Sequence, residues 1–72
     1  MKQYIIKSEI FNDYFLKVEP NSLKHYNIYW SNDINDAKRY DTKKDANTAL
    51  GMLQGMSKDD LGLVILEVDK DE

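Results

Sequence analysis

Carboxylates cluster in the middle of the chain, and carboxylate oxygens are the usual ligands of hard cations such as Ca²⁺. The four candidates are Asp33, Asp36, Asp41 and Asp45. An EF-hand loop places its acids at alternating positions around a central glycine and closes with a glutamate, whereas this stretch has no glycine and a different spacing. Asp33 and Asp36 lie where helix capping and the helix dipole favour acids. We therefore expect capping here rather than metal binding.

A basic cluster overlaps these acids and consists of Lys38, Arg39, Lys43 and Lys44. Cations of this kind can hold a phosphate group, but acids interleave them and no glycine-rich loop accompanies them. We expect them to form a solvated helical face.

His25, the single histidine, is the natural candidate for a general base. Nucleophilic catalysis also needs an activated cysteine or serine within reach. The chain has no cysteine, and its serines lie in no recognisable elbow motif. We expect a surface or edge-strand histidine, and the sequence predicts no catalytic residue, no cofactor site and no metal site. The protein is expected not to be an enzyme.

Length and charge further limit the class of protein to which this chain can belong. The chain has 72 residues and a formal net charge of −3. A domain this small has a small core and no disulfides, so a partner or a second copy would supplement its stability. The negative charge argues against general affinity for phosphate backbones. No membrane span or signal-peptide pattern is present, so we expect a cytoplasmic location.

Alternating apolar and polar residues predict three strands near the start of the chain. Residues 4–10 and 14–19 alternate around the turn signal Asn12-Asp13, as in a β-hairpin. Pro20 cannot donate to a ladder and closes the second strand. Residues 25–30 alternate again and form the third strand, whose Trp30 is expected to lie in the core.

Helical spacing replaces this alternation after residue 31. Asp33 follows two other good capping residues, and Ile34, Ala37 and Tyr40 recur at helical spacing, which predicts a short helical turn. Thr42 then resembles the first residue of a capping box. An apolar stripe behind it predicts a helix over residues 43–56 and consists of Ala46, Ala49, Leu50, Leu53 and Met56.

The uncharged run at residues 61–66 predicts a last strand covered on both faces. The fold class is therefore α+β, a mainly antiparallel sheet of three or four strands with one helical layer in the order β-β-β-α(short)-α-β. We expect one domain: a three-strand meander at 1–31, a helical segment at 32–57 and the final strand at 61–69.

One helix can cover only one face of this sheet. The side chains expected to face it are Tyr4, Ile6, Tyr14, Leu16, Val18, Tyr26, Ile28, Trp30, Val64, Leu66 and Val68. The opposite face would carry Ile5, Phe15, Tyr29, Leu63 and Ile65, which is too apolar for a solvated face. We hypothesise that another protein, or a second copy in a homodimer, covers this face or the edge beside it. The alternative is a set of scattered surface hydrophobes, which are normal singly.

Two further features bear on binding. Asp59 and Asp60, with Asp69, Asp71 and Glu72, concentrate negative charge and could mimic DNA in a basic groove or only give solubility. The aromatic side chains of Phe15 and Tyr29 would also suit a platform that stacks bases, although no RNP-like motif is present.

The stretch Y-W-S-N-D-I-N-D-A-K-R-Y-D-T-K-K-D-A covers about a quarter of the chain. It resembles a recurrent element of small accessory proteins from phages of low-GC Gram-positive bacteria, and the matching residues are Trp30, Ala37, Tyr40, Thr42 and Ala46. The resemblance implies a phage protein that acts in the host cytoplasm by binding a host protein, such as a defence nuclease or replication factor. It supplies no functional residue.

We therefore expect a non-enzymatic protein-interaction module that inhibits or redirects a host protein. The residues expected to contact that protein are Ile5, Phe15, Tyr29, Leu63, Ile65, Asp59 and Asp60. The alternative is a nucleic-acid-associated module that binds single strands through outward aromatics of the sheet.

Overall fold

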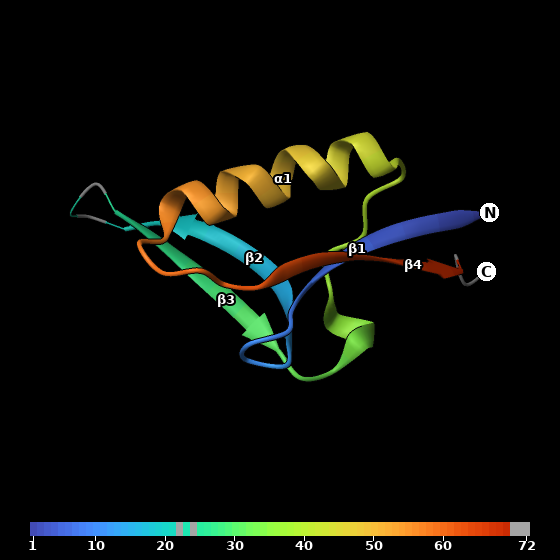
Figure 1. The fold of residues 1–72 in the computed structure, drawn as a ribbon, viewed down its shortest axis with the longest axis horizontal. Helices are drawn as coiled ribbons and strands as arrows, with labels where there is room; N and C mark the ends of the chain where they lie inside the picture. The colour runs from blue at the N-terminus through green and yellow to red at the C-terminus, as the bar shows by residue number, and fades with distance from the viewer. Residues whose placement is uncertain (22, 24, 70–72) are drawn as a thin grey trace.

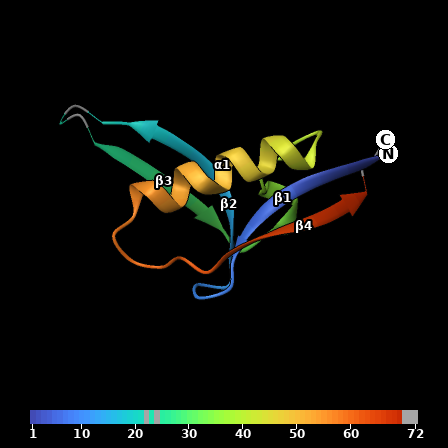
Figure 2. The same ribbon diagram turned by 45° about the horizontal axis from the view of Figure 1, so that its top comes forward.

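The computed structural model describes residues 1–21, 23 and 25–69 (Figure 1). Its elements in chain order are β1 (Lys2–Ser8), β2 (Asp13–Pro20), β3 (Tyr26–Ser31), the 3₁₀ helix η1 (Ile34–Asp36), α1 (Lys43–Met56) and β4 (Leu63–Asp69). The strands form one antiparallel sheet in the order β3-β2-β1-β4, and α1 packs on one side of it (Figure 2). This architecture confirms the predicted α+β fold.

The sheet is continuous at one end and divided at the other. β1 pairs with β4 from Lys2↔Asp69 to Ser8↔Leu63. In contrast, β1 pairs with β2 only at Lys7↔Tyr14 and Ser8↔Asp13, next to the hairpin turn. The β1–β4 and β2–β3 pairs therefore diverge away from that turn (Figure 1).

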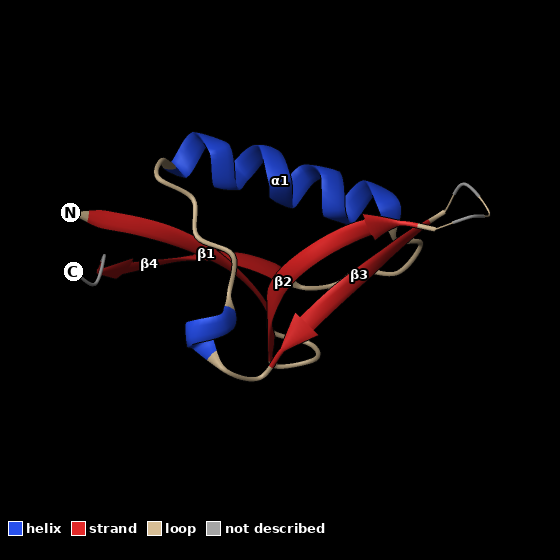
Figure 3. Cartoon of the chain, turned by 180° about the vertical axis from the view of Figure 1, so that it is seen from behind, coloured by secondary structure: helices blue, strands red, loops and turns tan. Residues whose placement is uncertain are grey.

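The chain between η1 and α1 fills the gap between the two pairs (Figure 3). The backbone N–H of Lys38 donates to the carbonyl of Phe15 at 3.0 Å, and Tyr4 and Tyr40 exchange two backbone hydrogen bonds of 2.8 Å. These bonds satisfy polar groups that β1 and β2 would otherwise leave unpaired. They also explain why the predicted helical turn is short: Ala37 is already extended and Tyr40 forms a β-bridge, so only Ile34–Asp36 is helical.

Local signals set the helix boundaries. The Thr42 hydroxyl accepts a hydrogen bond from the Asp45 backbone N–H at 3.1 Å, and α1 begins at the next residue, Lys43, as predicted. The side chains of Ala46, Ala49 and Leu53 are buried against the sheet, which confirms most of the predicted stripe.

The core lies between α1 and the sheet. Its buried members are Ile6, Phe15, Ala49 and Leu53, and the half-buried side chains packed against them are Val18, Ile28, Trp30, Tyr40, Leu50 and Leu63. Trp30 meets the ring of Phe15 edge-on, with ring centres 6.2 Å apart, and so belongs to the core as predicted.

A β-bulge reverses the expected alternation in β2. Phe15 pairs with Trp30 and Lys17 pairs with Tyr29, which leaves Leu16 as an extra residue between them. Phe15 therefore shares the α1 face with Val18, and Tyr14 faces the other way beside its partner Lys7. The prediction that Tyr14 points toward the helix and Phe15 away from it was wrong, because alternation in sequence does not reveal a bulge.

The two faces of β4 are also exchanged relative to the prediction. Leu63 and Ile65 lie opposite Ser8 and Ile6, and cross-strand partners point to the same face, so both belong to the α1 face. The outward residues are Val64, Leu66 and Val68, whose partners are Lys7, Ile5 and Gln3. Because residues 61–66 are uncharged and do not alternate, their sequence could not show which of them face α1.

Candidate functional site

The five apolar residues of the predicted interaction patch do not form one exposed surface. Ile5 and Phe15 are 0% and 2% exposed, so neither can contact a partner in the folded chain. Leu63 and Ile65 are half-buried on the side that α1 covers. Of the five apolar residues assigned to the patch, Tyr29 is the most exposed, at 39%.

The face opposite α1 is amphipathic rather than simply apolar. The Lys7 Nζ atom lies 5.8 Å from the centre of the Tyr14 ring, and the Lys17 Nζ atom lies 5.1 Å from the centre of the Tyr29 ring. These cation–π contacts lay lysine stems over the aromatic rings. Ile5 points to this face and is fully buried, so it is not available to a partner there.

β4 offers a different kind of surface, because it is an edge strand that pairs, among the described residues, with β1 alone. Alternate backbone N–H and C=O groups of such a strand point away from the sheet and are free to pair. Its register against β1 runs unbroken over seven residues, and it contains no proline. In the described part of the chain, no backbone hydrogen bond from a loop reaches residues 63–69.

The loop before β4 is held in place by Gln54 of α1. The Gln54 Nε2 atom donates to the Asp59 carbonyl at 2.9 Å, and its Oε1 atom accepts from the Leu61 N–H at 3.2 Å. The Asp60 carboxylate accepts from the Gly62 N–H at 2.9 Å. These bonds hold the backbone at Asp59 and the carboxylate of Asp60 beside the start of β4, where both side chains are exposed.

Ser8 ties this loop to the β1–β2 turn. Its hydroxyl is fully buried, donates to the Leu61 carbonyl at 2.6 Å and accepts from the Phe11 N–H at 3.1 Å. Sequence reasoning did not single out Ser8, although a serine among the alternating apolar residues of a strand is a signal for such a bond. The hydroxyl helps to set where β4 begins.

The other end of β4 carries an ion pair with β1. The Lys2 Nζ atom lies 2.6 Å from Asp69 Oδ1 and 4.0 Å from Glu67 Oε1. The hydrogen bond and charge of Lys2 lower the pKa of Asp69, and Asp69 in turn raises the pKa of Lys2. Both side chains are exposed, so the pair contributes little to stability.

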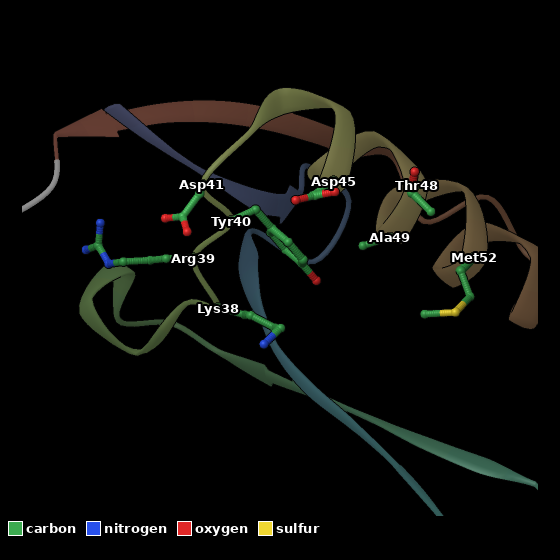
Figure 4. Close-up of a pocket in the computed structure, with 8 residues that line it drawn as sticks. All are labelled: Lys38, Arg39, Tyr40, Asp41, Asp45, Thr48, Ala49 and Met52. Carbon is green, nitrogen blue, oxygen red and sulfur yellow. The ribbon is translucent and has the colours of Figure 1, made fainter. Parts of the chain in front are cut away.

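A cleft of about 500 Å³ lies between residues 38–41 and α1 (Figure 4). Its charged side chains are Lys38, Arg39, Asp41 and Asp45, whose formal charges cancel. Figure 4 shows Arg39 extending away from the Tyr40 ring, so the two cations do not converge on one point. A ligand pocket needs a few convergent polar groups, and this cleft lacks them even though burial raises the pKa of Tyr40.

The remaining candidates have structural roles or lie in solvent. The Asp33 carboxylate caps η1 as predicted by accepting from the Asn35 N–H at 2.9 Å, and Asp36 accepts from the Ser31 hydroxyl at 2.9 Å. Asp41 accepts from the Gln3 side chain at 3.0 Å. His25 is exposed just before β3, as predicted.

Three of the four residues of the basic cluster, Lys38, Lys43 and Lys44, are exposed, whereas Arg39 is half-buried. Among the described residues, no group of three or more His, Cys, Asp or Glu side chains is placed to hold a metal ion. Asp71 and Glu72 of the acidic set lie outside the described residues.

No protein-family model, no curated protein and no solved structure matches the chain. Comparison with known proteins therefore assigns the chain to no family. Among the described residues, no helix has the length and apolar character needed to cross a membrane.

Proposed function

We propose that this chain is a non-enzymatic protein-interaction module that binds an extended segment of another protein by adding a strand at β4. The observation that supports it is the open edge of β4, whose register is unbroken over seven residues. In strand addition, main-chain hydrogen bonds supply affinity and side chains on alternate faces supply specificity. The half-buried Val64, Leu66 and Val68 would contact alternate side chains of that segment.

The resemblance of residues 29–46 to phage accessory proteins supports the biological setting of this proposal. In that setting the partner is a host defence or DNA-metabolism protein, and the module inhibits or redirects it by occupying one of its extended segments. Strand addition suits such a role, because it needs only an accessible stretch of partner backbone.

A charged substitution on the open edge tests the proposal. Val68→Lys places a lysine on β4, and edge lysines are a device by which natural sheets resist strand addition. Asn27→Lys places the same charge on β3, the opposite edge, beside its cross-strand partner Glu19. We expect the wild type and Asn27→Lys to capture the same host protein from nuclease-treated lysate of a low-GC Gram-positive bacterium, and Val68→Lys to lose it.

Circular dichroism of both variants controls for folding. Equal capture by folded Val68→Lys and wild-type protein would contradict binding at β4.

The Lys7–Tyr14 and Lys17–Tyr29 pairs favour one second candidate, a module that binds single-stranded nucleic acid on the face opposite α1. Exposed rings beside cations are the features that stack bases. Binding of an oligonucleotide that falls steeply with salt and is lost in Tyr29→Ala would support this candidate. The net charge of −3 and the Lys17–Glu19 ion pair at 3.1 Å oppose it.

A further inference from the structure

Negative charge lies at both ends of β4. Asp59 and Asp60 precede the strand, and Glu67 and Asp69 lie near its end, while residues 63–66 between them are uncharged. Within the described residues, the ion pairs of these carboxylates join Glu67 and Asp69 to the same lysine, Lys2. A strand laid along the open edge would therefore meet an apolar centre with two exposed carboxylates near each end.

β1 already pairs with β4, so its sequence indicates which side chains fit beside this strand. Lys2 lies opposite Asp69, Lys7 lies opposite Val64, and Ile5 and Ile6 occupy the centre opposite Leu66 and Ile65. β1 is therefore an apolar segment with a lysine toward each end. The open side of β4 presents the same side chains on the same two faces, so it also fits an apolar centre and a cation beside Asp69. Lys7 contacts the Tyr14 ring of β2, so the requirement at the other end follows from Asp59 and Asp60 instead.

We propose that the segment bound at β4 has an apolar, β-branched centre and a lysine or arginine at each end. This inference rests on the proposed function, since it specifies the chemistry of the partner segment that the open strand would bind. The backbone ladder supplies binding that is independent of sequence, whereas charge complementarity selects among segments and speeds their association.

A second copy of this chain would pair with the open edge of β4 less favourably than a basic segment. Two β4 strands paired antiparallel about Leu66 would set each Glu67 opposite Ile65 of the other copy. The two Glu67 side chains would then occupy diagonal positions on one face, roughly 7–8 Å apart. Such a dimer would also double the number of carboxylates along the edge, so like-charge repulsion favours a basic partner over self-association.

Three short peptides, blocked at both ends, test the charge requirement: KKTVTVTKK, QQTVTVTQQ and EETVTVTEE. Each is titrated into the ¹⁵N-labelled full-length chain while backbone amide shifts are recorded. We expect shift changes centred on residues 63–69 and an affinity for the lysine peptide about three- to tenfold above that for the glutamine peptide. The glutamate peptide should bind most weakly, and added salt should shrink these differences.

Neutralising the carboxylates before β4 provides a second measurement. The double variant Asp59→Asn, Asp60→Asn removes two charges, yet an asparagine carbonyl can still accept from the Gly62 N–H as Asp60 does. We expect it to reduce the preference for the lysine peptide. The matched control, Asp33→Asn with Asp36→Asn, removes the same charge at η1 and should leave the preference unchanged.

The outcomes separate this inference from the function on which it rests. Equal shifts of the β4 amides by all three peptides would overturn the charge requirement and leave strand addition standing. No shift at β4 with any peptide, together with equal capture of host protein by Val68→Lys and wild type, would overturn both. A concentration-dependent dimer whose β4 amides shift on dilution would replace the basic partner with a second copy.

Discussion

The two edges of the sheet differ in how they meet solvent. β3 is six residues long, carries the polar side chains of Asn27 and Ser31, and pairs with a strand that contains a bulge. β4 has seven residues in an unbroken register, with no charge before Glu67. A bulge increases the local twist of a strand pair, and regular strands are better templates for strand addition, so the irregular β2–β3 pair makes β3 the poorer template and the uncharged stretch of β4 before Glu67 the better one.

A difference in regularity between the two edges favours pairing at one of them. It has a structural cause, because the bulge opposite β3 is also the one that turns Phe15 into the core. The predictions below test whether the two edges depend on separate supports.

The largest effect should follow from removing the support beneath β3. Phe15→Ala deletes a ring that is 2% exposed and packs on Trp30, and it should lower the free energy of unfolding by about 3–5 kcal/mol. Tyr29→Ala, on the outer side of the same sheet, should cost less than about 1 kcal/mol. Urea unfolding followed by the fluorescence of the single tryptophan measures both variants. Equal losses would show that Phe15 is not in the core.

The next effect should come from the buried hydroxyl that positions β4. Ser8→Ala leaves the Leu61 carbonyl and the Phe11 N–H without their partner and should cost about 1–3 kcal/mol. Ser31→Ala at the end of β3 removes a hydroxyl with two hydrogen bonds in an exposed setting and should cost about 0.5 kcal/mol. Denaturant unfolding compares the pair. A larger loss for Ser31→Ala would reverse our view of which edge depends on a buried bond.

A smaller effect is expected at Gly62, directly before β4. Its φ is +60°, and a Cβ there would lie 2.9 Å from the Ile10 Cγ1 atom. Gly62→Ala should therefore destabilise the protein by about 1–2 kcal/mol. A Cβ at Gly51 in α1 would meet no atom within 4 Å, so Gly51→Ala should stabilise by about 0.5–1 kcal/mol. Thermal unfolding shows whether each variant is more or less stable than the wild type. A loss of stability in Gly51→Ala as well as in Gly62→Ala would contradict the expectation for Gly51.

The smallest effect concerns the Lys2–Asp69 pair at the end of β4. Because Lys2 holds the folded-state pKa of Asp69 below its usual range, the contribution of Asp69 to stability is present above the unfolded pKa and fades as pH falls through the folded pKa. Lys2→Gln should return the pKa of Asp69 toward its ordinary value. Carboxyl NMR titration below about pH 5 measures the shift. An unchanged Asp69 midpoint would show that the pair does not form in solution.

Local sequence signals were enough to locate most elements. The capping residues Asp33 and Thr42, the stripe on α1 and the turn signal before β2 each act within a few residues, so the sequence predicted the order of elements and the bounds of α1. Propensity and capping are short-range properties, and these elements depend on little else.

Assignment of the faces failed where long-range pairing decides them. The bulge at Leu16 forms because β2 must pair with β3, and the phase of β4 follows from its register with β1. Neither is encoded in the alternation of a single strand. The apolar residues of the predicted patch were misassigned for the same reason, since the patch depended on which side chains point outward. The acids Asp59 and Asp60 were placed correctly on an exposed loop because their position depends only on local polarity.

The pairing of β1 with β4 also has a consequence for how the chain folds. Lys2 and Asp69 are 67 residues apart in sequence, so the strand pair under α1 closes the longest loop in the domain. The chain loses the entropy of closing this loop before the non-local contacts can stabilise it. Folding is therefore slower than for helical proteins of the same size. The β2–β3 hairpin and α1 are local and can form first. We expect the open edge at β4 to form late in folding, so that binding there would report completed folding.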